Sequence, residues 1–196
     1  PRCQRAGLIA VFLALSVICA CIFLNDRSSL AAEPNGPAQA AKDMIVAANP
    51  HAARAGQDIL GAGGSAIDAA IAAQMVLGLV EPQSSGIGGG GFLLHFNATS
   101  GAIESFDGRE TAPAAADGDL FRKDNGELMS WPEAASGGLS VGVPGLLRML
   151  EMAHRKHGRL PWSRLFEPAI QLAENGFVVS PRMAESIAGN PDLADF

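Results

Sequence analysis

Arg109 is the side chain in this sequence whose type and setting best suit ligand binding. It lies in the run Asp107-Gly108-Arg109-Glu110-Thr111-Ala112-Pro113, directly after an apolar, strand-like stretch. A guanidinium presents a planar fork of donors that can hold both oxygens of a carboxylate. The same spacing also allows an ordinary ion pair with Asp107 or Glu110, and such pairs are common on protein surfaces. The residues themselves leave both interpretations open.

Three carboxylates, Glu104, Asp107 and Glu110, recur every three residues around this arginine. Paired carboxylates can perform acid-base catalysis when they face each other across a substrate. These three run from the end of a strand into a loop, so their spacing does not require them to converge. We therefore interpret them as a solvated rim.

Two of the four histidines, His154 and His157, are spaced to share one face of a helix. Such a pair can recruit a metal ion, but no carboxylate beside them completes a usual ligand set. We expect a solvated, basic helix end there, and neither a metal site nor a cofactor. The chain also has no Gly-x-Ser-x-Gly or Ser-x-x-Lys motif for a serine nucleophile.

Residues 86–91 contain five glycines in six positions, between an apolar helical pattern and an apolar strand pattern. Gly86-x-Gly88-x-x-Gly91 formally fits the dinucleotide-binding pattern, but that pattern needs a strand before it and a helix after it. No Lys-Ser or Lys-Thr follows, which excludes a P-loop. We expect the glycines to provide positive φ angles or close approach of the backbone to a neighbour.

Hydrophobic periodicity and turn residues predict the elements that position these groups. Ser65, with Asp68 three residues later, should cap a central helix that is apolar almost all round and too short to span a membrane. The predicted elements are a buried strand at 44–48, helices at 51–60 and 67–80, a hairpin of 92–96 with 102–106, a helix that opens at Pro144 and ends at His157, and helices at 161–175 and after Ser180.

The first 32 residues have the order of charge, apolar run and small residues that is typical of an export signal. Arg2 and Arg5 precede the uncharged residues 6–24, and cleavage after Ala31 or Ala32 fits the pattern. A lipoprotein site at Cys21 and an uncleaved membrane anchor are alternatives. Residues 33–43 read as a linker. We therefore expect an exported protein, periplasmic or extracellular, that contacts a membrane only through this segment.

The exported part carries a net negative charge and no cysteine. Beyond Ala31 the chain has 11 basic and 19 acidic residues, so nucleic acid is an unsuitable partner. Cys3, Cys19 and Cys21 all lie in the leader, which argues against a small disulfide scaffold.

Four stretches together resemble the beginning of a gamma-glutamyltranspeptidase (glutathione hydrolase) precursor. They are 61–70, 81–92, 107–113 and 136–145, and their order and intervals agree with that family. The resemblance covers roughly 44–181. It is strong because four separate motifs concur, whereas any one of them would be a weak signal.

The resemblance implies an N-terminal nucleophile hydrolase, an α/β (α+β) fold built as an αββα sandwich, with residues 44–196 as the N-terminal part of the large subunit. Proenzymes of this family cleave themselves into a large and a small subunit, and the newly exposed threonine attacks a gamma-glutamyl amide with its own amino group as base. The family's arginine in the Asp-x-Arg-Glu-x-Ala-Pro motif, which grips the α-carboxylate of the substrate, corresponds to Arg109. The implied partners are this small-molecule substrate and the rest of the proenzyme.

The implied nucleophile does not match any residue of this chain. Its only threonines, Thr99 and Thr111, lack the Thr-Thr-His context of the family. We therefore expect no catalytic residue within the chain, and no self-cleavage or turnover by the chain alone. The alternatives are a related amide hydrolase, such as a cephalosporin acylase or a poly-gamma-glutamate processing enzyme, and an inactive truncated binding fragment.

Overall fold

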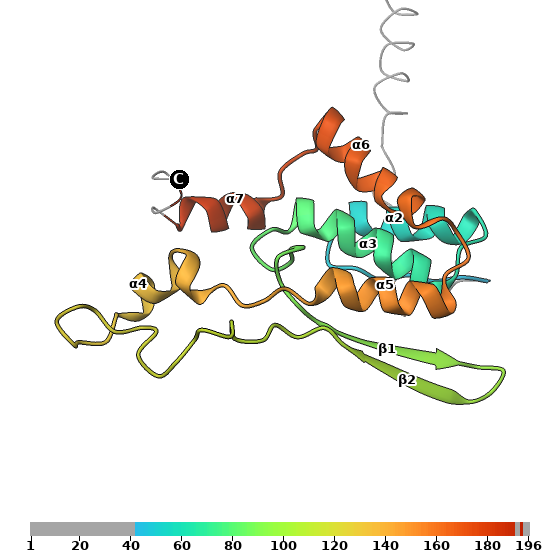
Figure 1. Cartoon of the computed structure of the whole chain (residues 1–196). Helices are drawn as coiled ribbons and strands as arrows, with labels where there is room; N and C mark the ends of the chain where they lie inside the picture. Colours follow the sequence, from blue (N-terminus) through green and yellow to red (C-terminus); the bar gives the residue numbers. More distant parts are fainter. Residues whose placement is uncertain (1–41, 191–192, 194–196) are drawn as a thin grey trace, which may run out of the picture. The chain divides into compact units, whose positions relative to one another are not determined.

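The computed structural model describes residues 42–190 and 193, which belong to one compact unit (Figure 1). The predicted export signal or anchor and most of the predicted linker lie outside the described residues. Among the helices that the structure describes, none combines the length and the hydrophobicity needed to cross a membrane.

Two helices near the start of this unit form at the predicted places. α2 (Pro50–Gly61) begins with proline in its first turn, and the side chain of Asn49 accepts a hydrogen bond from the amide of His51. α3 (Ala66–Val80) begins with a reciprocal cap, because Ser65 and Asp68 each bind the other's amide. Both helices therefore start where their polar caps satisfy free backbone amides.

α3 is the central helix of the described unit. Its apolar side chains are buried around most of its circumference, and α2, α5 and α6 all pack against it (Figure 1). Alanines at 69, 72 and 73 keep its surface narrow, which lets the neighbouring helices approach closely. This confirms the prediction of a central core helix.

The hairpin follows the glycine loop. β1 (Phe92–Asn97) pairs antiparallel with β2 (Ala102–Asp107), with Phe92 opposite Asp107 and Asn97 opposite Ala102. The turn is closed by Asn97, whose side chain accepts hydrogen bonds from the amides of Thr99 and Ser100. Side chains alternate between the faces: Phe106 packs against α5, whereas Phe92, Leu94, Phe96 and Ile103 are exposed.

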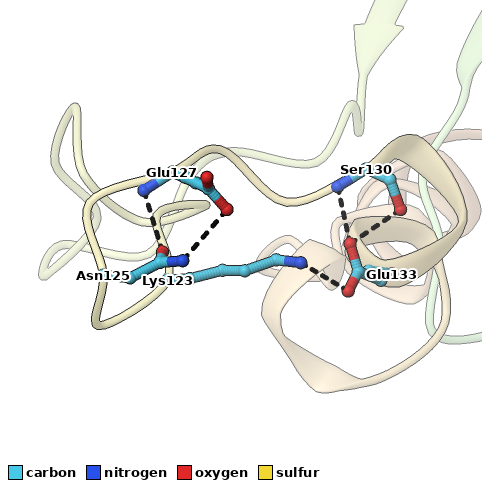
Figure 2. A network of polar contacts seen from close by, with 5 residues as sticks. All are labelled: Lys123, Asn125, Glu127, Ser130 and Glu133. Carbon is cyan, nitrogen blue, oxygen red and sulfur yellow. Dashed lines mark hydrogen bonds and ion pairs between the residues drawn. The ribbon is translucent and has the colours of Figure 1, made fainter.

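A long irregular segment leads from the hairpin to α5. It contains the short helices α4 (Trp131–Ala135) and η1 (Gly138–Ser140). Figure 2 shows the polar network that organises its turn: Glu133 accepts from both the amide and the hydroxyl of Ser130 and pairs with Lys123 at 2.7 Å. Asn125 and Glu127 close the turn itself.

The remaining helices confirm the predicted order with one boundary changed. They are α5 (Leu146–His157), the short η2 (Trp162–Phe166), α6 (Glu167–Asn175) and α7 (Pro181–Ala188). α5 begins two residues after the predicted opening at Pro144. Before it, the amide of Val143 is bonded to the carbonyl of Thr111 in an isolated bridge. Pro144 and Gly145 then separate that bridge from the first turn.

The predicted buried strand at 44–48 was wrong. This segment has no regular secondary structure and pairs with no strand among the described residues, whose only sheet is the hairpin. Its side chains alternate: Ile45 and Ala47 pack against the core, while Val46 is 84% exposed. The short apolar run supplies side chains to the core, but a strand also requires a neighbouring ladder of hydrogen bonds.

Candidate substrate-binding site

Arg109 lies where the hairpin ends and the irregular segment begins. Gly108 extends the pairing of the hairpin by exchanging two backbone hydrogen bonds with Gly91. The amide of Arg109 then donates to the side chain of Asp107 at 2.9 Å, which turns the chain out of the sheet. Asp107 thus contacts the backbone of Arg109, while the guanidinium remains available to a ligand.

Three glycines, Gly90, Gly108 and Gly145, allow close contact between the backbone segments next to Arg109. A Cβ on Gly90 would lie 2.8 Å from the amide nitrogen of Glu110, and one on Gly145 would lie 2.8 Å from the carbonyl carbon of Gly108. The amides of Gly145 and Leu146 both donate to the carbonyl of Gly89. Since no glycine at 86–91 has a positive φ, close approach is the reason for glycine at Gly90.

The side chain of Arg109 lines two cavities. One, of about 500 Å³, lies between the glycine loop and α3, and its lining includes Gln74, Ser85 and Glu110. The other, of about 350 Å³, lies toward the irregular segment. The side chain of Arg109 is 69% exposed, and its Nη1 lies 3.3 Å from Oε2 of Glu110. Arg109 therefore pairs with Glu110 and also lines a cavity that a ligand can enter.

We predicted that Glu110 belongs to a solvated rim, and the structure shows that this prediction was wrong. Its side chain is 27% exposed, and its Oε2 is buried without a hydrogen-bond donor among the described residues. Its ion-pair partner is Nη1 of Arg109 at 3.3 Å, and an ionised carboxylate oxygen can accept a further hydrogen bond. An arginine beside an acceptor-only carboxylate could receive the two charged ends of an amino acid.

The start of the glycine loop is held by a buried carboxylate that the sequence analysis did not single out. Glu81 is 4% exposed and accepts hydrogen bonds from Asn49 at 2.9 Å, Gln83 at 2.7 Å and Arg182 at 3.1 Å. Arg182 also donates to Ser84 in the loop. The contacts join three distant segments, and only the position of Glu81 just before the glycine loop marked it in the sequence.

The other two predicted carboxylates lie apart from Arg109's cavities. Glu104 accepts from His157 at 2.8 Å, and Lys156 lies 3.5 Å away. The hydrogen bond from His157, helped by the charge of Lys156, holds the pKa of the Glu104 carboxyl below its usual value. Glu104 is thus held against α5, and neither Glu104 nor Asp107 lines the two cavities that Arg109 and Glu110 share.

The two histidines of α5 are not a solvated helix end, contrary to our interpretation. The side chain of His154 is 16% exposed and lies 3.5 Å from buried Asp68, with its Nε2 2.9 Å from the carbonyl of Leu160. The side chain of His157 is 20% exposed and its ring stacks on that of His95. Their shared helix face meets carboxylates from α3 and the hairpin, which sequence spacing did not reveal.

Neither threonine is placed as a nucleophile beside Arg109's guanidinium. Thr99 lies in the exposed turn of the hairpin. Thr111 lines the smaller cavity, but its backbone is paired with Val143 inside the chain. An amino-terminal threonine therefore has no counterpart among these two residues.

Comparison with known structures gives the class of protein. The fold resembles Helicobacter pylori gamma-glutamyltranspeptidase with a TM-score of 0.72 and 37% identity over 78% of this chain and 44% of that one. It also resembles a cephalosporin acylase from Bacillus halodurans, with a TM-score of 0.58 and 31% identity over 78% of this chain and 29% of that one. The mixed helices and sheet are thus part of an N-terminal nucleophile hydrolase fold, as predicted.

The family itself follows from the sequence comparisons. The model of the family described as gamma-glutamyltranspeptidase matches residues 52–194. The "Glutathione hydrolase proenzyme" of Bacillus subtilis (strain 168) is 43% identical over 145 residues, which are 74% of this chain and 25% of that protein. The chain belongs to the gamma-glutamyltranspeptidase family, a family of enzymes. It spans 22% to 25% of the length of the first curated relatives that it matches.

Proposed function

We propose that the protein containing this chain hydrolyses or transfers gamma-glutamyl groups, and that Arg109 binds the α-carboxylate of the glutamyl donor. The observation that carries this proposal is the position of Arg109, whose side chain is 69% exposed and which lines a cavity of about 500 Å³. A bidentate contact to an arginine fixes both the charge and the orientation of a carboxylate.

The neighbouring carboxylate extends the proposal to the α-amino group. Oε2 of Glu110 is buried, lacks a donor within the described part of the chain, and lies 3.3 Å from Arg109. An ammonium group would supply that donor. Arg109 would then bind the α-carboxylate of the glutamyl group, and Glu110 would bind its α-ammonium. Together the two contacts would hold the gamma-amide at a fixed distance from this site.

The chemical step would be carried out by a residue outside this chain. In the proposed reaction an amino-terminal threonine attacks the gamma-carbonyl, and the amine of the leaving group departs as the acyl-enzyme forms. Water or an acceptor amine then takes the acyl group. The rest of the proenzyme, including its small subunit, would supply this nucleophile and the remaining substrate contacts, and the predicted export signal would place the enzyme outside the cytoplasm.

A related amide hydrolase is the second candidate, favoured by the likeness to the Bacillus halodurans cephalosporin acylase. The two candidates differ in what they require of the acyl group. A gamma-glutamyl enzyme needs both a carboxylate and an ammonium on the α-carbon, and the paired charges of Arg109 and Glu110 fit that requirement better.

Release of aniline from gamma-glutamyl anilides tests the proposal. We expect the complete protein to release product above a buffer blank and to prefer the gamma-glutamyl compound to its glutaryl analogue, which lacks the amino group. We expect the 196-residue chain alone to release none. Turnover by the isolated chain would contradict the assignment of the nucleophile, and a preference for the glutaryl compound would favour the second candidate.

A further inference from the structure

A cluster of three potential metal ligands lies on the side of the hairpin that faces α5. His95 of β1 is the direct partner of Glu104 of β2 in the antiparallel register, and His157 is the last residue of α5. One ligand atom from each residue lies within 4.8 Å of the others. None of these residues lines either cavity beside Arg109, so the cluster is separate from the proposed glutamyl site.

An ion pair alone does not account for the whole cluster. Glu104 and His157 satisfy each other at 2.8 Å, but Nδ1 of His95 is buried and has no hydrogen-bond partner among the described residues. The ring of His95 instead stacks on that of His157, with the centroids 3.9 Å apart. A buried ring nitrogen without a partner needs an explanation, and a bound ion that draws on both rings provides one.

We propose that His95, Glu104 and His157 bind a divalent transition-metal ion, with zinc as the best match. Two imidazole nitrogens and one carboxylate oxygen form a ligand set that zinc uses when its fourth position is left to water. Tetrahedral zinc with bonds of about 2.1 Å places its ligand atoms roughly 3.4 Å apart. One pair of these atoms is 2.8 Å apart, and all three lie within 4.8 Å of one another, a range that includes this value.

Binding would require small local changes. The ion replaces the proton shared by Glu104 and His157, and these two atoms move apart by less than an ångström to reach roughly 3.4 Å. One of the stacked rings turns, because an imidazole binds a metal through a lone pair in the plane of its ring. Lys156, 3.5 Å from Glu104, is 60% exposed and is free to swing away.

The surroundings leave room for the fourth ligand. His95 and His157 both line a cavity of about 550 Å³, which a water molecule could enter. The ion would join the hairpin to the end of α5, two elements that already meet through Phe106 and through the contacts of His157 with His95 and Glu104. Because the ligands come from three elements, bound metal should stabilise the folded state over the unfolded one.

Calorimetric titration with zinc chloride tests the site on the protein in its full expressed length. The protein carries no histidine tag, and Cys3, Cys19 and Cys21 are replaced by serine because thiolates bind zinc. We expect one zinc ion per chain in this parent and in the matched control His51→Gln. We expect affinity to fall at least tenfold in both His157→Gln and Glu104→Gln.

A second measurement separates loss of the site from loss of the fold. Zinc should raise the thermal unfolding midpoint of the parent and of His51→Gln, and should leave that of Glu104→Gln unchanged. The two variants at the site replace different ligands on different elements, so a folding defect in one leaves the other informative. Absence of zinc binding by the parent, or parental affinity in the two site variants, would overturn the proposal.

Discussion

The carboxylate of Asp68 accepts a hydrogen bond at 2.9 Å from the amide of Arg159, which lies 91 residues further along the chain. The same oxygen also accepts from the amides of Leu160 at 3.2 Å and Ser65 at 2.8 Å. Asp68 is completely buried. A side chain that looked like a local helix cap therefore also fixes the turn that follows α5 against the first turn of α3.

Replacing this carboxylate should destabilise the fold strongly. In Asp68→Ala three amides lose their acceptor, and each buried, unsatisfied group costs about 1–3 kcal/mol. Because such costs are not additive, we expect the free energy of unfolding to fall by about 3 kcal/mol, measured by urea denaturation. Asp58→Ala, an exposed acid on α2, is the matched control and should change little. Equal midpoints for the two variants would show that Asp68 does not have this role.

The cap of α4 should weaken in acid. Hydrogen bonds from Lys123 and Ser130 lower the pKa of Glu133 from 4.5 to about 2, so the folded state favours the ionised form (Figure 2). The stabilisation is therefore fully present above pH 4.5 and is lost as the pH falls toward 2. Hydrogen exchange at the Ser130 amide, corrected for its intrinsic rate, should show protection declining over this range. In Glu133→Gln that decline should be absent, and constant protection in the unmodified protein would refute the assignment.

Two neighbouring glycines should respond differently to the same substitution. Gly90→Ala places a methyl group 2.8 Å from the amide nitrogen of Glu110, whereas the Cβ position of Gly88 has no neighbour within 4 Å. Forcing apart such a close contact costs about 1–3 kcal/mol, and the displaced Glu110 should also weaken substrate binding. We expect Gly88→Ala to be nearly neutral in urea denaturation. If both variants lose the same stability, close approach is not the reason for Gly90.

Local patterns predicted most of the elements. Ser65 with Asp68, Asn49 before Pro50, and the turn residues after Asn97 are short-range signals, and all three define the ends they indicated. The strand at 44–48 was wrong because pairing depends on a neighbour that the local sequence does not contain. α5 starts two residues after the predicted opening at Pro144, and the bridge between Val143 and Thr111 just before it joins segments that local sequence does not connect.

The candidate site was predictable only in part. Arg109 could be found because its motif is continuous in the sequence. The burial of Glu110, the anchoring of Glu81 by Arg182, and the meeting of His95 with His157 all depend on contacts between distant segments. Side-chain spacing along one element carries no information on which other element will lie opposite, so these features required the structure.

Glu110 should select for the amino group of the substrate. Glu110→Gln keeps the size of the side chain but removes the charge that faces an ammonium, and charged hydrogen bonds contribute about 1.5–3 kcal/mol. In the complete protein we expect kcat/KM for gamma-glutamyl anilide to fall roughly 10- to 150-fold. The glutaryl analogue, which has no amino group, is the matched control and should lose much less. Equal losses for both substrates would mean that Glu110 acts only on the position of Arg109.

The central claim is that the guanidinium of Arg109 binds the α-carboxylate of a gamma-glutamyl donor, and the most direct test is the KM of Arg109→Lys in the complete protein. Lysine keeps the charge but loses the planar fork, and a loss of about 2–3 kcal/mol corresponds to a roughly 30- to 150-fold rise in KM. The 4-aminobutyryl anilide, which lacks only the carboxylate, should show no such rise. An unchanged KM for the gamma-glutamyl anilide would contradict the account.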